Sequence, residues 1–178
     1  GTADGDARPN ELYELIEDCF GAVLHIQEHA SEYCLDPKRL AVTGDSAGGH
    51  LCTSVANMIE RVGDGGFGVN PGVFEYMPTY MPKGMTVEKA RKSLMAIKAV
   101  APNYGVFSAE GVGRFVRNLP AEGRAALAPL DNVPDASVRK IPHWINRGTA
   151  DPLISEASTM EYYEAVKAAG QEVHYVKV

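Results

Sequence analysis

The chain has 178 residues, of which 45% are hydrophobic and 22% charged, a composition typical of one globular domain with a hydrophobic core. Its formal net charge of −6, with lysines and arginines spread along the chain, argues against a nucleic-acid-binding surface. No apolar run approaches the ~20 residues needed to span a bilayer. Cys19, Cys34 and Cys52 lack metal-binding spacing, so we expect thiols of a reducing compartment, which slightly favours the cytoplasm.

Strands and helices are predicted to alternate along the chain. Apolar residues at three- and four-residue steps predict the helices, and short apolar runs predict the strands. The expected order is helix 9–33, buried strand 39–43, helix 46–61, helix 86–94, strand 96–101, short helical pieces within 109–128, strand 141–146, helix 155–169 capped by Gly170, and strand 172–178. This alternation predicts a mainly parallel sheet with helices on both faces.

The stretch from about 62 to 94 is expected to be an inserted region of this single domain. Its first part, 62–83, is rich in glycine and proline and carries Phe67, Phe74, Tyr76 and Tyr80. Long loops inside compact domains are usually functional or mobile. We expect some of these aromatic side chains to line the substrate pocket or to form a partner interface, with a local mini-core as the alternative.

Residues 44–49 read Gly-Asp-Ser-Ala-Gly-Gly and lie between a predicted strand and a predicted helix, the order of a nucleophile elbow. Such a turn holds its serine on a strained backbone, and glycines remove side chains that would collide there. Ser46 is therefore the candidate nucleophile, and the backbone N–H of Ala47 the candidate oxyanion-hole donor. Asp45 either holds the adjacent loops or faces solvent. The alternative is a phosphate-binding turn, but no lysine follows as in a P-loop.

A serine nucleophile needs a base, and that base needs an acid to orient it. In proteins with such an elbow, the acid follows the nucleophile in the sequence and lies just after a later strand. Asp151 fits this position, because it lies in the loop 148–152 after the predicted strand 141–146. The alternative is an aspartate that caps the next helix, but that helix is predicted to begin near Ser155. Asp151 is therefore the candidate acid.

The five histidines offer no evident base. His174 lies within the last predicted strand, whereas the base is expected in a loop beyond a strand. His25 and His29 match the spacing of a zinc-binding helix, but no third ligand is evident, and we expect no metal and no cofactor. His50 is expected near the site without a chemical role, and His143 is expected to be structural.

These motifs resemble the α/β-hydrolase superfamily, in particular hormone-sensitive-lipase-like esterases and bacterial carbohydrate acetyl or feruloyl esterases. The likeness rests on the elbow with the stretch before it (35–50), the acid loop (148–154), and the helix and strand that follow (157–178). It implies an α/β-hydrolase fold and an enzyme that cleaves carboxylic esters of short acyl groups through an acyl-enzyme. The expected partner is a small ester substrate, and a homo-oligomer is left open.

Two features of these esterases are missing: a His-Gly-Gly-type loop before the first helix and a histidine after the last strand. We expect the chain to be truncated at both ends relative to the working protein, with the missing strands supplied by the same polypeptide or by another copy. Two other functions stay open. One is a serine peptidase of the prolyl-oligopeptidase type, and the other is a binding module on an inactive hydrolase scaffold.

Overall fold

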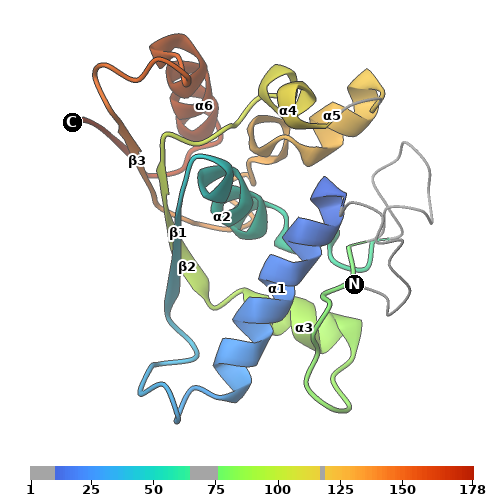
Figure 1. Ribbon diagram of the computed structural model, residues 1–178. Helices are drawn as coiled ribbons and strands as arrows, with labels where there is room; N and C mark the ends of the chain where they lie inside the picture. The colour runs from blue at the N-terminus through green and yellow to red at the C-terminus, as the bar shows by residue number, and fades with distance from the viewer. Residues whose placement is uncertain (1–10, 65–75, 117–118) are drawn as a thin grey trace.

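The computed structural model describes residues 11–64, 76–116 and 119–178, which form one sheet with helices packed beside it (Figure 1). The elements in chain order are α1 (Leu12–Glu28), β1 (Leu40–Asp45), α2 (Ala47–Asn57), the 3-10 turn η1 (Ile59–Arg61), α3 (Val87–Leu94), β2 (Ile97–Asn103), α4 (Ala109–Phe115), α5 (Ala121–Leu127), the 3-10 turn η2 (Pro129–Asn132), β3 (His143–Arg147), α6 (Glu156–Ala168) and β4 (Val173–Lys177). None of the helices in these ranges is long and apolar enough to cross a membrane.

The four strands run parallel in the spatial order β1-β2-β3-β4, so each strand pairs with the next one in the chain. One register row crosses the whole sheet, from Val42 through Val100 and His143 to Val173. The predicted parallel sheet with alternating helices is thereby confirmed. In such a sheet all carboxyl ends of the strands lie at the same edge.

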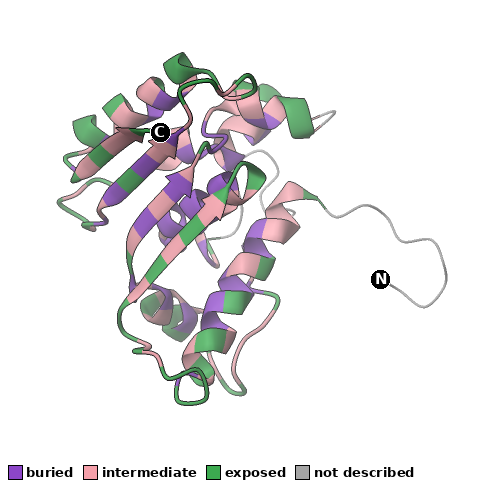
Figure 2. Ribbon diagram, turned by 60° about the vertical axis from the view of Figure 1, so that its left-hand side comes forward, coloured by how far each residue is buried: buried purple, intermediate pink, exposed green. Residues whose placement is uncertain are grey.

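The described helices lie on one face of this sheet. Helix α2 packs on β1 and β2, α6 packs on β3 and β4, and Asn57 of α2 donates a hydrogen bond of 3.0 Å to the Tyr162 hydroxyl of α6. Because the strands are added in one direction, right-handed crossovers bring every connecting helix to the same side. Within the described ranges, the expected cover on both faces is therefore present on one face only, and Figure 2 shows the other face open.

Strand β1 is half-exposed, although its apolar composition predicted a buried strand. Leu40 and Val42 are partly buried on the side of the helices, whereas Ala41 and Thr43 are exposed on the other side. The prediction of a buried strand is wrong for this structure. The physical reason is that β1 lies at an edge of the described sheet and one of its faces carries no described helix.

Two hydrophobic clusters fill the space between the sheet and the helices. The larger one joins Ile16, Phe20 and Leu24 of α1 to side chains of α2 and β2. The smaller one is centred on Phe107 and Tyr162, whose rings stack with centroids 4.1 Å apart. Each fully buried side chain of this size stabilises the fold by roughly 1.5–3 kcal/mol, so this face carries most of the hydrophobic stabilisation.

Several helix ends follow from local sequence. The hydroxyls of Thr86 and Ser155 accept hydrogen bonds from backbone N–H groups in the first turns of α3 and α6. Gly170 follows α6 with a φ of 76°, as expected for a glycine that ends a helix. Helix α1 ends at Glu28, earlier than predicted, because the chain turns at 29–34 and reaches a φ of 54° at Cys34.

The end of the inserted region packs along α1. Tyr76 is buried with its ring 5.8 Å from that of Phe20, and its hydroxyl donates to Met58 Sδ at 3.4 Å. Tyr80 donates from its hydroxyl to Glu28. Tyr76 belongs to the larger hydrophobic cluster and Tyr80 is partly buried against it, so both side chains pack on the main core of the domain. The other two aromatic residues, at positions 67 and 74, lie outside the described residues.

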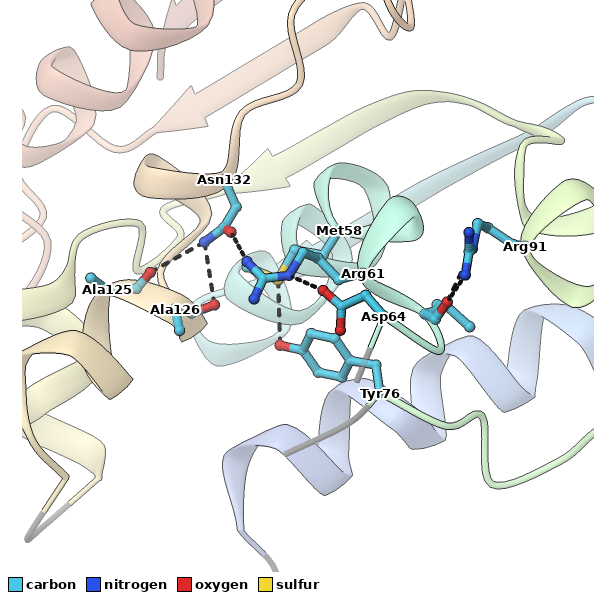
Figure 3. A network of polar contacts seen from close by, with 9 residues as sticks. Met58, Arg61, Asp64, Tyr76, Arg91, Ala125, Ala126 and Asn132 are labelled. Atoms are coloured by element: carbon cyan, nitrogen blue, oxygen red, sulfur yellow. Dashed lines mark hydrogen bonds and ion pairs between the residues drawn. The ribbon is translucent and has the colours of Figure 1, made fainter. Parts of the chain in front are cut away.

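A polar network holds the start of this region (Figure 3). Arg61 donates to Asn132 Oδ1 at 3.2 Å and to Asp64 at 2.8 Å. Asn132 in turn donates from Nδ2 to the carbonyl of Ala128 at 2.8 Å. Arg91 of α3 donates two hydrogen bonds to the carbonyl of Val62. Bonds between side chains join η1 to η2, and bonds to backbone carbonyls hold the 3-10 turn η2 and join α3 to Val62, so these contacts have a structural role.

Candidate active site

Ser46 lies where β1 ends and α2 begins, with φ 55° and ψ −114°. A residue other than glycine in such a conformation costs of order 1–3 kcal/mol and persists only where the surroundings enforce it. Here the Ser46 N–H donates to the Asn103 carbonyl at 3.0 Å, and the Ser46 carbonyl accepts from the His50 N–H at 3.1 Å. The predicted strand, strained turn and helix are therefore confirmed as local structure.

The glycines of the turn do not all serve the purpose expected of them. A Cβ on Gly44 would lie 2.3 Å from the carbonyl oxygen of Gly48, so the tight turn excludes any side chain there. A Cβ on Gly49 would lie 2.8 Å from Gly105 Cα, in the turn after β2. At Gly48 a Cβ would meet nothing within 4 Å, so the expectation of a collision at that position is wrong.

Ala47 is the first residue of α2 and is exposed beside Ser46. The first N–H groups of a helix have no acceptor within the helix, and the helix dipole places partial positive charge at this end. The structure therefore presents the Ala47 backbone next to Ser46 at a helix N-terminus, a position that favours negative charge.

Asp151 lies in the loop after β3. Its Oδ1 accepts hydrogen bonds from the N–H groups of Leu153 at 2.8 Å and Ile154 at 3.0 Å, while Ser155 caps α6. The N–H of Ile154, then that of Leu153, and the charge of Arg147 lower the pKa of Asp151 below its usual value. The carboxylate is thus ionised at neutral pH, and both bonds use one oxygen, which leaves Oδ2 for a further donor.

Arg147 holds this loop in place. Its side chain is 5% exposed, and it donates from Nε to the Ile154 carbonyl at 2.7 Å and from Nη2 to the Asp151 carbonyl at 3.2 Å. The chain end is tied in as well, because the Thr149 N–H donates to the Val178 carbonyl at 2.7 Å. Arg147 is not among the predicted site residues, although an arginine at the end of a strand just before a predicted acid loop is a usable signal.

The structure brings Ser46 and Asp151 to the same edge of the sheet. We call this the carboxyl edge, formed by the strand ends Asp45, Asn103 and Arg147. One strand, β2, lies between β1 and β3, so with about 4.8 Å per strand the two strand ends are about 10 Å apart. That separation leaves room for one imidazole ring between a serine hydroxyl and a carboxylate.

Tyr104, which the sequence analysis did not single out, follows β2 between these two positions. It has a φ of 39°, and its N–H donates to the Asn146 carbonyl at 2.7 Å. Partial burial raises the pKa of its phenol, and the carboxylates of Asp45 and Asp151 raise it further. The phenol therefore lies within electrostatic reach of both sides of the edge.

A cavity of about 480 Å³ opens beside Ala47. Helices α1, α2 and α4 supply most of its walls, and the lining is mainly aliphatic and aromatic. It consists of Glu11, Leu12, Leu15, Ala47, His50, Leu51, Val106, Val112, Phe115 and Val116. A concave apolar cavity next to a strained serine is the arrangement expected of a site that binds the apolar part of a small molecule.

His50 forms part of that cavity but is engaged elsewhere. It is 3% exposed, and its Nε2 hydrogen-bonds the Leu127 carbonyl at 2.9 Å and the Ser54 hydroxyl at 3.4 Å. Burial lowers its pKa, so the ring is neutral at pH 7. These contacts connect α2 to the last residue of α5, and the absence of a chemical role for His50 stays a prediction.

The remaining histidines also have structural surroundings. His174 is in the middle of β4, where its ring is tilted against that of Trp144 with centroids 5.0 Å apart and its Nε2 contacts Glu172 Oε1 at 3.1 Å. His143 is buried and donates from Nδ1 to the Ile141 carbonyl, and burial lowers its pKa to about 4.

His25 and His29 have ring centroids 4.4 Å apart on α1. Among the described residues no group of three or more potential ligands could hold a metal ion. The described residues therefore provide no third ligand that would support a zinc site at His25 and His29.

A family model for the alpha/beta hydrolase fold matches residues 9–178. The chain belongs to the α/β-hydrolase family. The predicted relationship is thus confirmed, and it accounts for the strained serine turn at the carboxyl edge. No curated protein matches the chain.

Solved esterases share this α/β-hydrolase fold. A truncated carbohydrate esterase from gut microbiota has a TM-score of 0.61 and 17% identity, over 92% of this chain and 59% of that one. An esterase from the Planctomycetes species Thermogutta terrifontis has a TM-score of 0.62 and 20% identity, over 95% of this chain and 54% of that one. A lipase/esterase from Lactobacillus plantarum has a TM-score of 0.58 and 16% identity, over 92% and 58%. The chain thus spans somewhat more than half the length of these structures.

Proposed function

We propose that the protein is a serine esterase that hydrolyses carboxylic esters of short acyl groups. The observation that carries the proposal is Ser46, held at φ 55° at the N-terminus of α2. Asp151 at the same edge of the sheet and the apolar cavity beside Ala47 support it. Backbone strain of this kind costs stability, so the surrounding fold must stabilise it. Residues with such strain are concentrated at functional sites.

In the proposed reaction the Ser46 hydroxyl attacks the ester carbonyl carbon and forms a tetrahedral intermediate. The alcohol then leaves, and water releases the acyl group from the serine in a second attack. The base that accepts the serine proton would be an imidazole. Within the described ranges no histidine side chain hydrogen-bonds to the side chain of Ser46 or Asp151, so we assign this role to a histidine outside the 178 residues.

Asp151 and Ala47 would stabilise the charges that develop. The ionised Asp151 would accept a hydrogen bond from the imidazole through Oδ2 and stabilise its cationic form. The N–H of Ala47 would donate to the oxyanion, and a single donor of this kind typically lowers the barrier by roughly 3–4 kcal/mol. No metal or cofactor takes part in these steps.

The preference for short acyl esters draws on the cavity and on one relative. The esterase of Thermogutta terrifontis is described with propionate bound and with butyrate bound. The cavity here has apolar walls on α1, α2 and α4, which suit the aliphatic part of an ester. The same esterase is described as phosphorylated by paraoxon, which provides a direct probe for the present protein.

The decisive experiment is labelling of the full-length protein with paraoxon, followed by peptide mass spectrometry. We expect one diethyl phosphate on Ser46 and a parallel loss of p-nitrophenyl butyrate hydrolysis. Ser46→Ala should take up no label, while Ser155→Ala, which changes the exposed cap of α6, should be labelled like the wild type.

Two results would contradict the proposal in different ways. An unlabelled wild-type protein without ester turnover would favour a binding module on an inactive scaffold. Faster hydrolysis of a prolyl amide than of a short ester would favour a peptidase instead.

A further inference from the structure

Three polar side chains form a hydrogen-bonded row along the carboxyl edge. Asp45 of β1 lies opposite Asn103 of β2, which lies opposite Asn146 of β3. Asn103 Nδ2 donates to Asp45 Oδ1 at 2.8 Å, and Asn146 Nδ2 donates to Asn103 Oδ1 at 2.7 Å. The indole of Trp144 extends the row by donating to Asn146 Oδ1 at 3.1 Å.

The direction of this row is fixed by chemistry. An ionised carboxylate only accepts hydrogen bonds, so Asn103 must present its NH₂ group to Asp45 and its oxygen to Asn146. Asn103 is thus the one member that both donates to the strand before the serine and accepts from the strand before the acid loop. A carboxamide is the side chain that offers both functions in one plane.

The backbone of the same turn contacts the elbow directly. The carbonyl of Asn103 accepts from the Ser46 N–H at 3.0 Å. The next residue, Tyr104, has a φ of 39°, and the following Gly105 lies so close to Gly49 that a Cβ on Gly49 would be 2.8 Å from its Cα. Two non-glycine residues at positive φ, Ser46 and Tyr104, therefore lie in adjacent turns that hold each other.

The other end of the row leads to the acid loop. Asn146 is followed by Arg147, whose guanidinium holds the carbonyls of Asp151 and Ile154. A displacement between β2 and β3 would therefore move the loop that carries Asp151 relative to Ser46.

We propose that Asn103 is a positioning residue, which fixes the spacing between the Ser46 turn and the strand that carries the Asp151 loop. This inference rests on the proposed esterase function. Asn103 is not among the residues that line the apolar cavity, so it acts through alignment of the site and not through binding of the acyl group. Misplacement of reacting groups by about 1 Å can lower a rate by about 100-fold.

The experiment compares Asn103→Leu and Asn103→Asp with the wild type in the full-length protein. The measurements are kcat and KM for p-nitrophenyl butyrate between pH 5.5 and 9, the rate of phosphorylation by paraoxon, and the thermal midpoint. For Asn103→Leu, which loses both side-chain bonds, we expect kcat and the phosphorylation rate to fall about 10- to 100-fold with little change in KM.

Asn103→Asp supplies a readout that a purely structural role would not give. Two carboxylates would then face each other across β1 and β2, which raises the pKa of the pair. Below that pKa one proton restores the bond to Asp45, and above it the two charges repel. The kcat of this variant relative to the wild type should therefore fall as pH rises. Tyr104 and Asp151 face the same edge in both proteins, so the comparison with the wild type at each pH isolates the effect of the substitution.

Asn132→Leu is the matched control, because Asn132 also bridges several groups but lies in the network of Figure 3. It should lower the thermal midpoint without changing kcat. The inference is overturned if Asn103→Leu retains wild-type kcat, or if the relative kcat of Asn103→Asp is the same at every pH. If Asn103→Leu does not fold, the nearly isosteric Asn103→Asp decides alone. A wild-type protein that neither turns over esters nor takes up paraoxon refutes the proposed function itself.

Discussion

The carboxyl edge of the sheet and its helix-covered face differ in almost every physical respect. At the edge, Ser46 and Tyr104 adopt positive φ, and polar side chains bond across strand ends that are partly exposed. On the covered face, side chains such as Leu24 and Ile145 are buried and apolar. Strain at the edge persists because packing elsewhere supplies the stability. Substitutions at the edge should therefore change rates, and substitutions in the core should change stability.

The largest effect is expected for Ser46→Ala. Removal of the nucleophile should lower kcat for p-nitrophenyl butyrate by about four to six orders of magnitude, because no acyl-enzyme can form. The KM and the thermal midpoint should change little, since Ser46 is exposed and its hydroxyl lies outside the core. If Ser46→Ala retained a tenth of the wild-type kcat, Ser46 would not be the nucleophile. The expected contrast between the edge and the core would then fail.

Asp151→Asn is expected to come next. An amide would keep an acceptor for the loop N–H groups but would lose the charge that stabilises the imidazolium, so kcat should fall by about 10³- to 10⁴-fold. Steady-state kinetics at pH 8 would measure it. Asp135→Asn offers a control, because Asp135 also accepts a backbone N–H near its own position but lies away from the carboxyl edge. Equal losses in the two variants would argue against a catalytic role for Asp151.

Leu24→Ala tests the core side of the comparison. Leu24 is 1% exposed in the larger cluster, and its truncation should lower the free energy of unfolding by about 2–5 kcal/mol while kcat below the melting range stays unchanged. Val138→Ala, at a side chain that is 75% exposed, should change the free energy of unfolding very little. Denaturant titration of both variants measures the free energy of unfolding. A large loss of kcat in Leu24→Ala would show that the edge and the core are not independent.

The free energy of unfolding should depend on pH through the protonation of His143. Burial lowers its pKa to about 4 in the folded chain, while an unfolded histidine titrates near 6.5. The unfolded state therefore binds the proton first as pH falls, and the free energy of unfolding should decrease by up to about 3 kcal/mol between pH 6.5 and 4. His50, with a pKa also lowered by burial, acts in the same direction. His143→Asn should flatten this slope in denaturant titrations, and an unchanged slope would refute the assignment.

The smallest effect is expected in the apolar cavity. Leu51 is half-buried in its wall, and Leu51→Trp should reduce the space for longer acyl chains. We expect the ratio of kcat/KM for acetyl over hexanoyl esters to rise by about 10-fold, because each methylene in such a pocket is worth roughly 1–3 kcal/mol. Leu51→Met, which preserves the volume, should leave the ratio near the wild-type value. If Leu51→Trp left this ratio unchanged, the acyl group would have to bind outside the cavity.

Local structure was largely determined by the sequence alone. Some residues act on neighbouring backbone groups, so their effect can be recognised from short-range spacing. They are Gly44 in the serine turn, the caps Thr86 and Ser155, and Gly170 after α6. The periodicity of apolar residues likewise gave the alternation of helices and strands and hence the parallel sheet. For the same reason the motif at 44–49 led to the correct family.

Only the tertiary structure decided which distant residues meet. Asn103 and Asp45 are 58 positions apart, and Asn146 and Asn103 are 43 apart, yet strand order and register make them direct neighbours. The half-exposed β1 and the one-sided cover of helices follow from the order in which the strands are added, which apolar periodicity does not encode. The cavity depends in the same way on three helices that converge beside Ala47. Contacts of this kind arise from packing and pairing across the whole sheet, whereas turns and caps arise from a few adjacent residues.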